Sequence, residues 1–339
     1  MTTRARDLGI SIGSGTPGPL NAITDVPGVR VGHPTVVRGA GGDPHAVRTG
    51  VTALFPHEGH PWREWGVLMS PIVLTSSLQI GKAYDATVRW IAGRDPIGAE
   101  EVMPVVSECD DSWLSDVLSF PLADDDVAAA LDAAAAGSVE EGNVGAGTGM
   151  QCFDFKGGIG TASRALGDDE GGFTIGALVL TNYGSREHLR IDGVPVGREL
   201  TDLMPREHHE GSCVVVVATD APLLPHQLTR IARRTGLGLA ATGSHASNGS
   251  GEQMMAFSTS NRLDSSEAIR DVRAVVDGPV RHTYALSALF RATVEATEEA
   301  VVNALVAAED SVGRDGHTYF AMPVDRVLES LDRAGRLSH

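Results

Sequence analysis

The chain alternates short apolar runs with turns that are rich in glycine, and this pattern limits its possible folds more than any other feature. Glycine supplies 40 of the 339 residues, about 12% of the chain where roughly 7% is usual. The apolar runs between the turns have the length of strands, as in Gly176–Leu180 and Val214–Ala218. Short apolar runs joined by tight turns predict a protein that is rich in β-sheet.

Helical spacing of apolar residues interrupts these strand-like runs in several places. Helices are predicted from about Leu78, over residues 124–136, over Leu223–Arg234, from about Leu286 to Ala308, and over Val324–Ala334. We expect Ser76 or Ser77 to cap the first helix and Asp220 to cap the third. The alternation predicts a mixed α/β protein in which sheet packs against helices. No repeat or linker is visible, so residues 1–339 are expected to form one domain.

The charge balance and the length of the apolar runs argue against two classes of partner. The net charge is −17, and no stripe of Lys and Arg is present that would neutralise nucleic-acid phosphates. No apolar stretch reaches the ~18 residues of a membrane span, and residues 1–7 contain no apolar signal region. The protein is therefore expected to bind neither nucleic acid nor membrane.

Three cysteines, Cys109, Cys152 and Cys213, are widely separated, so they form no metal-binding pattern and cannot all pair. We expect reduced, buried thiols and a cytoplasmic protein.

Cofactor and metal motifs are not matched. Gly145-x-Gly147-x-Gly149 lacks the G-x-G-x-x-G spacing of a dinucleotide loop. The histidines do not form a ligand set such as H-E-x-x-H, and we expect no metal and no cofactor. The candidates among the 12 histidines are His33, His45, His57, His60, His188 and the charged His208-His209 pair. Asp220 and His226 offer two members of a hydrolase triad, but the G-x-S-x-G motif of α/β-hydrolases is missing.

The stretch Asn248-Gly249-Ser250-Gly251-Glu252 joins a polar run to the strand-like segment Met254–Thr259. By itself this composition is also that of a plain loop. If the Gly249–Ser250 bond were cut, Ser250 would carry a hydroxyl nucleophile beside a free α-amine. Such an amine has a pKa of ~7.7–8.0 and serves as a base near neutral pH. The hypothesis is that the chain cuts itself here and becomes an amide hydrolase.

Several long motifs, taken in order, resemble one known family. They are residues 18–33, 48–52, 141–150, 155–164, 191–197, 218–225, 248–251 and 295–300. On these motifs the chain is similar to the self-processing N-terminal-serine peptidases, which include the L-aminopeptidase/D-Ala-esterase-amidases (DmpA-like) and the β-peptidyl aminopeptidases.

The resemblance implies a four-layer α/β/β/α sandwich, which is similar in layout to N-terminal-nucleophile hydrolases but differs in connectivity. It implies that the precursor breaks between Gly249 and Ser250. The fragments 1–249 and 250–339 then stay folded together, and the processed units form a homo-oligomer. The implied reaction releases the N-terminal residue from a small peptide, amide or ester through an acyl-enzyme on Ser250.

Further roles are assigned to residues near the matched motifs. Asn182, at the end of a core strand, is the candidate donor for the oxyanion. The family uses a second serine and a glutamate, for which Ser287 and Glu298 are the candidates, although Glu295 lies on the same helix. A carboxylate must hold the substrate ammonium. Glu141 is the first candidate and Glu108, in the acidic run Glu108-Cys109-Asp110-Asp111, is the second, although that run also fits a solvated turn.

Two positions depart from the family pattern. Glu252 stands where an aspartate is common, and Phe153 stands where some relatives have tyrosine. Two other readings therefore stay open. One is a hydrolase of non-peptide amides or oligoamides, and the other is an unprocessed, inactive homologue that binds a small molecule.

Overall fold

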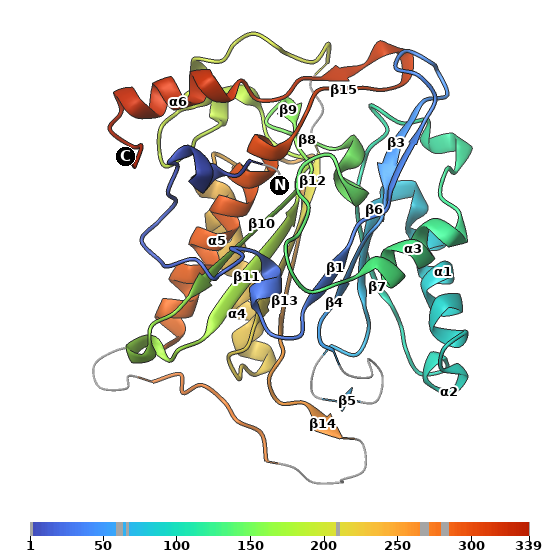
Figure 1. The fold of residues 1–339 in the computed structure, drawn as a ribbon, viewed down its shortest axis with the longest axis vertical. Helices are drawn as coiled ribbons and strands as arrows, with labels where there is room; N and C mark the ends of the chain where they lie inside the picture. The colour runs from blue at the N-terminus through green and yellow to red at the C-terminus, as the bar shows by residue number, and fades with distance from the viewer. Residues whose placement is uncertain are drawn as a thin grey trace.

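A computed structural model describes residues 3–58, 64–65, 68–207, 211–264, 271–278 and 285–338. His60, His208 and His209 lie outside these residues. Two four-stranded sheets form the centre of the molecule (Figure 1). The first has the order β1 (Arg30–Gly32), β4 (Thr52–Phe55), β6 (Ile72–Ser76), β7 (Val105–Cys109). The second has the order β10 (Ile159–Ala165), β11 (Thr174–Leu180), β12 (Ser212–Thr219), β13 (Gly251–Ser258).

Both sheets end in a parallel pair of strands, whereas their other pairs are antiparallel. The helix α1 (Ile80–Ala92) connects β6 to β7, and α4 (Pro225–Ala241) connects β12 to β13. A parallel pair needs such a crossover, which places a helix on one face of each sheet. Strands β7 and β13 each form one edge of their sheet, and β1 and β10 form the other edges.

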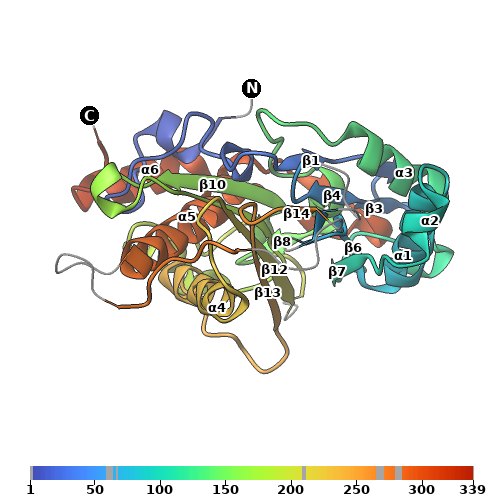
Figure 2. The ribbon, with the colours of Figure 1, turned by 90° about the horizontal axis from the view of Figure 1, so that it is seen from below.

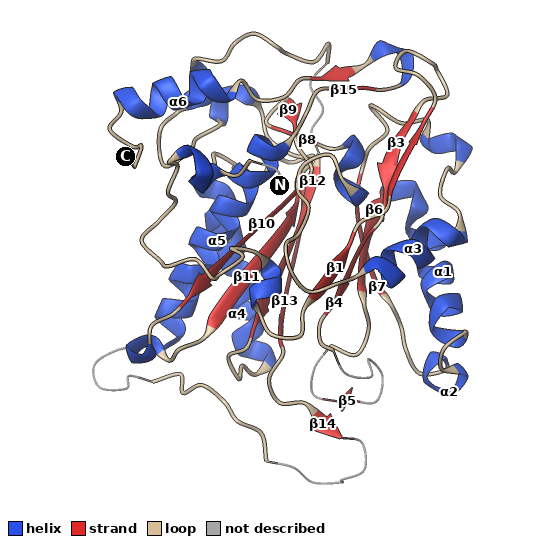
Figure 3. Ribbon diagram, viewed as in Figure 1, coloured by secondary structure: helices blue, strands red, loops and turns tan. Residues whose placement is uncertain are grey.

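The two sheets pack face to face between outer layers of helices (Figure 2). Leu54 and Leu74 from the first sheet meet Leu178 and Val216 from the second in one buried core. The outer face of the second sheet packs against α4 and α5 (Ala285–Ala307). The outer face of the first packs against α1 and α3 (Asp124–Ala133). The predicted four-layer α/β/β/α arrangement is therefore confirmed (Figure 3).

The continuous apolar run in β12 follows from this layering. Val214 and Val216 face the other sheet, whereas Val215 and Val217 face the helices. A strand that is covered on both faces needs apolar side chains at every position rather than at alternate ones.

Smaller elements close the ends of the sandwich. They are the strand pairs β2–β3 (Thr35–Arg38, Val47–Gly50), β5–β14 (Glu64–Trp65, Leu263–Asp264), β8–β9 (Gln151–Cys152, Phe155–Lys156) and β15–β16 (Ser311–Val312, Thr318–Tyr319), with the helices α2 (Pro96–Ala99) and α6 (Val324–Arg333). No helix in the described part of the chain is both long enough and apolar enough to cross a membrane.

The glycine-rich segment before β10 folds into the interior as the 3₁₀ helix η5 (Gly145–Gly149). The buried Lys156 ammonium donates to the carbonyls of Gly147, Met150 and Gly157 at 2.8–3.0 Å and fixes the segment. No strand was predicted over Ile159–Ala165, where the structure has β10.

Neither predicted helix cap forms through its side chain. Helix α4 begins at Pro225 with Leu224 as its N-cap, and Asp220 instead accepts a hydrogen bond from the Thr174 amide at 2.7 Å. Ser76 occupies the N-cap position of the 3₁₀ helix Ser77–Gln79 that leads into α1, but its side chain makes no capping bond. The Ser76 hydroxyl donates instead to Asp111, which follows β7, and the Ser77 hydroxyl donates to Glu108 within β7.

Candidate active site

Ser250 lies immediately before β13, at one end of the second sheet. Its backbone N–H donates to the Ser247 carbonyl at 2.8 Å, which closes a tight turn. The next amide, Gly251, donates to the Gly211 carbonyl at 3.2 Å and begins the parallel pairing with β12. The serine thus sits where a loop enters a strand.

The side chain of Ser250 has a carboxylate partner. Its Oγ donates a hydrogen bond to Oε1 of Glu252 at 2.7 Å. Side chains two residues apart on a strand share a face, so the period of a β-strand is the signal that relates these residues. The sequence noted Glu252 as a departure but assigned it no role.

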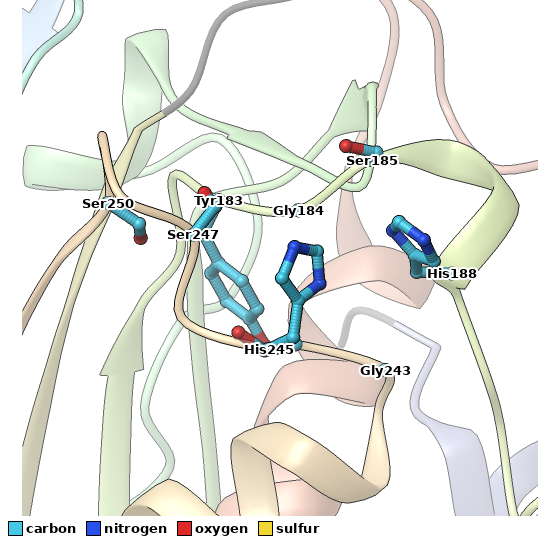
Figure 4. Close-up of a pocket in the computed structure, with 9 residues that line it drawn as sticks. Tyr183, Gly184, Ser185, His188, Gly243, His245, Ser247 and Ser250 are labelled. Atoms are coloured by element: carbon cyan, nitrogen blue, oxygen red, sulfur yellow. The ribbon is translucent and has the colours of Figure 1, made fainter.

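Ser250 lines a small pocket together with Tyr183, Ser185, His188 and His245 (Figure 4). The imidazoles of His188 and His245 meet edge to face with ring centroids 4.9 Å apart. Tyr183 is buried, and its hydroxyl forms a hydrogen bond with Thr242 Oγ1 at 3.1 Å. The sequence did not point to these pocket residues, because they are scattered along the chain.

Asn182 follows the last residue of β11, at the same end of the sheet as Ser250. Its carbonyl touches Gly211, where a Cβ would lie only 1.7 Å from the oxygen, and Gly211 in turn contacts Gly251. Its amide group donates to the Asp110 carbonyl at 2.9 Å and accepts from the Gln151 amide at 3.3 Å. Asn182 is therefore held rigidly near the start of β13.

Glu108, in the edge strand β7, reaches across to β13. Gln253 Nε2 donates to Glu108 Oε1 at 3.3 Å, and the Ser77 hydroxyl donates to its other carboxylate oxygen. Gln253 is three residues after Ser250, so Glu108 lies near the same end of β13.

The other acids of the run Glu108–Asp111 accept hydrogen bonds from serines outside β13. The carboxylate of Asp110 accepts two hydrogen bonds from Ser112. Asp111 is buried and accepts from the Ser76 hydroxyl at 2.6 Å, and burial raises its pKa to about 6. Glu108 is consequently the acid of this run whose carboxylate contacts β13.

Glu141 lies elsewhere in the fold. It is buried, accepts hydrogen bonds from the Arg4 guanidinium at 2.6 and 3.2 Å, and accepts one from the Thr161 amide at 2.8 Å. Thr161 belongs to β10, three strands from β13, which is a separation of roughly 14 Å. The structure does not bring Glu141 together with Ser250.

Ser287 is exposed near the N-terminal end of α5, at the opposite end of the sheet. One turn later Arg291 pairs with Glu170 at 2.6 Å, and Glu170 belongs to the connection from β10 to β11. That connection is at the Ser258 end of β13, which is roughly 23 Å along the strand from Gly251. The structure does not place Ser287 beside Ser250.

Glu298, in the middle of α5, is not among the residues that line the Ser250 pocket. Burial, together with the neighbouring charges of Asp192 and Glu295, raises the pKa of its carboxyl to about 7. Glu295 itself is bound to Arg164.

Two further sequence candidates also lie apart from Ser250. His226 pairs with Asp277 at 3.3 Å rather than with Asp220, so the conceivable triad is not assembled. Phe153 is fully buried and packs edge-on against Tyr183 at 5.2 Å. It does not line the pocket that contains Ser250.

The sequence pattern described as Peptidase family S58 matches residues 21–64 and 60–319. The chain belongs to this family. Beta-peptidyl aminopeptidase BapA of Sphingosinicella xenopeptidilytica is 40% identical over 368 residues, which span 97% of this chain and 90% of the relative.

Solved structures agree with the family assignment. A β-aminopeptidase of Burkholderia sp. superimposes with a TM-score of 0.88 at 42% identity, covering 98% of this chain and 99% of the other. The L-aminopeptidase D-Ala-esterase/amidase of Ochrobactrum anthropi, described as a new variant among the Ntn hydrolase fold, gives 0.88 at 40% identity and covers 99% of both chains. The family resemblance and the assignment as a hydrolase of the aminopeptidase type are confirmed.

Proposed function

We propose that this S58 peptidase is a self-processed serine aminopeptidase whose nucleophile is Ser250. The observation that carries the proposal is the position of Ser250 at the mouth of β13, with Asn182 and Glu108 held at the same end of that strand. A cut between Gly249 and Ser250 turns this serine into a chain terminus without moving the strand that anchors it.

After the cut, the α-amine of Ser250 takes the proton of its own hydroxyl, and Oγ attacks the carbonyl of the substrate. The leaving amine takes the proton as the acyl-enzyme forms, and water then hydrolyses the ester. The oxyanion needs a fixed donor. Asn182 Nδ2 carries two hydrogens, and the Asp110 carbonyl uses one of them.

The substrate ammonium requires a carboxylate that is not already neutralised by a cation. Glu108 meets this condition better than Glu141, because its carboxylate accepts hydrogen bonds from the neutral groups of Ser77 and Gln253. Glu141 is already paired with Arg4. The contacts therefore favour Glu108, the second of the two sequence candidates, as the residue that binds the free amine.

The substrate class is proposed as small peptides, amides or esters that carry a free N-terminal residue. The relatives are named for β-peptides and for L- and D-configured substrates, so β-amino, L-amino and D-amino acyl groups are all candidates. We further propose a cytoplasmic homo-oligomer of processed units. The three cysteines are free and buried, which supports a reducing location.

The proposal is tested by intact-mass measurement of the purified protein, together with hydrolysis of L-Ala, D-Ala and β-Ala p-nitroanilides. The expected masses are those of residues 1–249 and 250–339, and at least one substrate is hydrolysed. Ser250→Ala is expected to remain full-length and inactive, whereas Ser14→Ala, at an exposed serine, behaves as wild type.

A wild-type chain that stays full-length and inert on all three substrates would overturn the proposal and favour the inactive binding homologue. Hydrolysis by Ser250→Ala would exclude Ser250 as the nucleophile. Activity on simple amides, with none on aminoacyl p-nitroanilides, would favour the amide hydrolase instead.

A further inference from the structure

The uncut chain lacks the base that the mature enzyme uses. Before the Gly249–Ser250 bond breaks, the nitrogen of Ser250 is a peptide amide, and it donates its hydrogen to the Ser247 carbonyl. An amide nitrogen has no basic lone pair. The first step of self-cleavage therefore needs a different group to accept the proton of Ser250 Oγ. This argument rests on the proposed function and concerns the same serine.

One carboxylate is hydrogen-bonded to Ser250 Oγ, the atom that must lose its proton. Glu252 Oε1 accepts the hydrogen bond of Ser250 Oγ at 2.7 Å, which is within the reach of direct proton transfer. The bond joins two residues of the same strand end, so it is set by the backbone of β13 rather than by a distant loop.

The surroundings of Glu252 leave it available as a base. No ion pair to its carboxylate occurs within the described part of the chain. Cys213 lies opposite it in the register of β12 and β13, and Tyr183 is another neighbour. Burial raises the pKa of both side chains well above their usual values, so both are neutral at physiological pH. Neither neutralises the carboxylate.

The other polar groups of the pocket make different contacts. His188 and His245 contact each other, and the Tyr183 hydroxyl bonds Thr242. In the view of Figure 4 both imidazoles lie on the far side of the Tyr183 ring from the Ser250 hydroxyl.

We propose that Glu252 is the general base of self-cleavage. Its carboxylate takes the proton from Oγ as Oγ forms a bond to the carbonyl carbon of Gly249. The resulting carboxylic acid gives that proton to the nitrogen of Ser250 as the C–N bond breaks. The products are an ester between Gly249 and Oγ and a free α-amine on Ser250. Water then hydrolyses the ester, which releases the Gly249 carboxylate and regenerates the hydroxyl.

This assignment separates the two reactions that Ser250 performs. Self-cleavage depends on Glu252, because no amine exists at that stage. Turnover of substrate uses the α-amine and depends on Glu252 much less.

Glu252→Gln tests the proposal with little change in shape. The glutamine oxygen still accepts the hydrogen bond from Oγ but does not take its proton. Full-length chain is made by a short pulse of cell-free synthesis, and the appearance of residues 250–339 is followed by mass. Cleavage is expected to slow by about 100-fold or more, which is the usual contribution of a general base.

Two further variants and one activity measurement complete the test. Glu252→Asp keeps a carboxylate and is expected to recover at least about tenfold of the lost rate. Glu329→Gln removes a carboxylate from the exposed face of α6 and should cleave as wild type. Hydrolysis of the best p-nitroanilide, normalised to the amount of cut chain, should fall less than about tenfold in Glu252→Gln.

Cleavage of Glu252→Gln at the wild-type rate would overturn the role of Glu252 and leave the proposed function intact. Equal losses in cleavage and in normalised turnover would also overturn it, because a distorted site affects both reactions alike. A wild-type chain that never cleaves would instead contradict the proposed function itself.

Discussion

The carboxylates of Glu108 and Glu141 differ in the groups that donate hydrogen bonds to them. Glu108 accepts from a serine hydroxyl and a glutamine amide, which are neutral donors. Glu141 is buried against the Arg4 guanidinium and the Thr161 backbone amide. A charge that is already paired contributes to the fold, whereas one with only neutral partners can attract a cationic substrate.

Glu108→Gln and Glu141→Gln are therefore expected to have different effects. Glu108→Gln should raise KM for aminoacyl p-nitroanilides by about 10–100-fold, the value of one charge-assisted contact. Glu141→Gln should leave KM near the wild-type value but lower the free energy of unfolding by on the order of 2–3 kcal/mol, because Arg4 loses its partner. Steady-state kinetics and urea titration distinguish them. The reverse pattern would assign the ammonium site to Glu141.

The raised pKa of the Glu298 carboxyl affects the stability of the fold, and Glu298 does not line the Ser250 pocket. Burial, with Asp192 and Glu295 nearby, raises its pKa from 4.5 to about 7 in the folded protein. Between these values the folded state binds the proton and the unfolded state does not. Stability from this group is thus greatest below pH 4.5 and is lost as the pH rises to about 7.

Glu298→Gln should remove this pH dependence. At pH 8 the variant is expected to be more stable than its parent by on the order of 2 kcal/mol, and at pH 4 the two should be nearly equal. Urea unfolding in the Ser250→Ala background keeps every chain uncut. The same substitution can be tested for activity in processed protein that retains Ser250. Loss of hydrolysis there would support the catalytic role that the sequence suggested for Glu298.

At the scale of elements, the contact between β10 and α5 depends on a residue without a side chain. A Cβ on Gly160 would lie 1.9 Å from the Ala300 carbonyl and 2.8 Å from the Ala304 amide nitrogen. Both atoms are helix backbone, so they cannot rotate away as a side chain would. Helix α5, which follows the proposed cut, thus packs directly on β10, which precedes it.

Gly160→Ala is expected to push α5 outward and lower the free energy of unfolding by about 1–3 kcal/mol. Gly81→Ala on α1 is the matched control, because its Cβ would meet no atom within 4 Å. That change should stabilise the helix by roughly 0.5–1 kcal/mol. Urea titration of both variants in the Ser250→Ala background measures the difference. Equal stabilities would show that α5 adapts to the added methyl group.

At the scale of the whole molecule, the two parts that the proposed cut would create share one sheet and one core. Residues 1–249 supply β12, and residues 250–339 supply β13, its parallel partner along eight residues. The fully buried Arg164 guanidinium pairs with Glu295 at 3.1 Å and with Glu299 at 2.7 Å, both from the second fragment. Separating the fragments would leave these buried charges unpaired, which is costly.

The two fragments are therefore expected to remain associated after cleavage. Native size-exclusion chromatography of cut protein should give one peak that contains both chains, and they should separate only in denaturant. The elution volume also reports whether the processed units form the proposed homo-oligomer. Elution of residues 250–339 as a separate species in native buffer would contradict the shared-core interpretation.

Local patterns in the sequence were sufficient to predict the helices α1, α3, α4, α5 and α6, the strands β11, β12 and β13, and the position of Ser250 at a loop–strand boundary, but not α2 or residues 235–241 of α4. Apolar spacing and turn-forming residues act over a few residues, so they can be recognised from the sequence alone. The place of Asn182 at the end of a core strand was predictable for the same reason. Strand β10 was missed because Gly160, Ala162 and Ser163 interrupt the apolar and β-branched run that indicates a strand.

Only the tertiary structure decided which groups surround the serine and which have other partners. Glu108 and Gln253 meet because the packing of the two sheets brings β7 and β13 within side-chain reach, and Ser287 is distant because α5 begins at the other end of the sheet. Ser76 became a partner of Asp111 rather than a helix cap for a similar reason. The sequence determined where the nucleophile could stand, through local periodicity. The packing of distant segments determined which groups each carboxylate contacts, and these contacts cannot be predicted from spacing along the sequence.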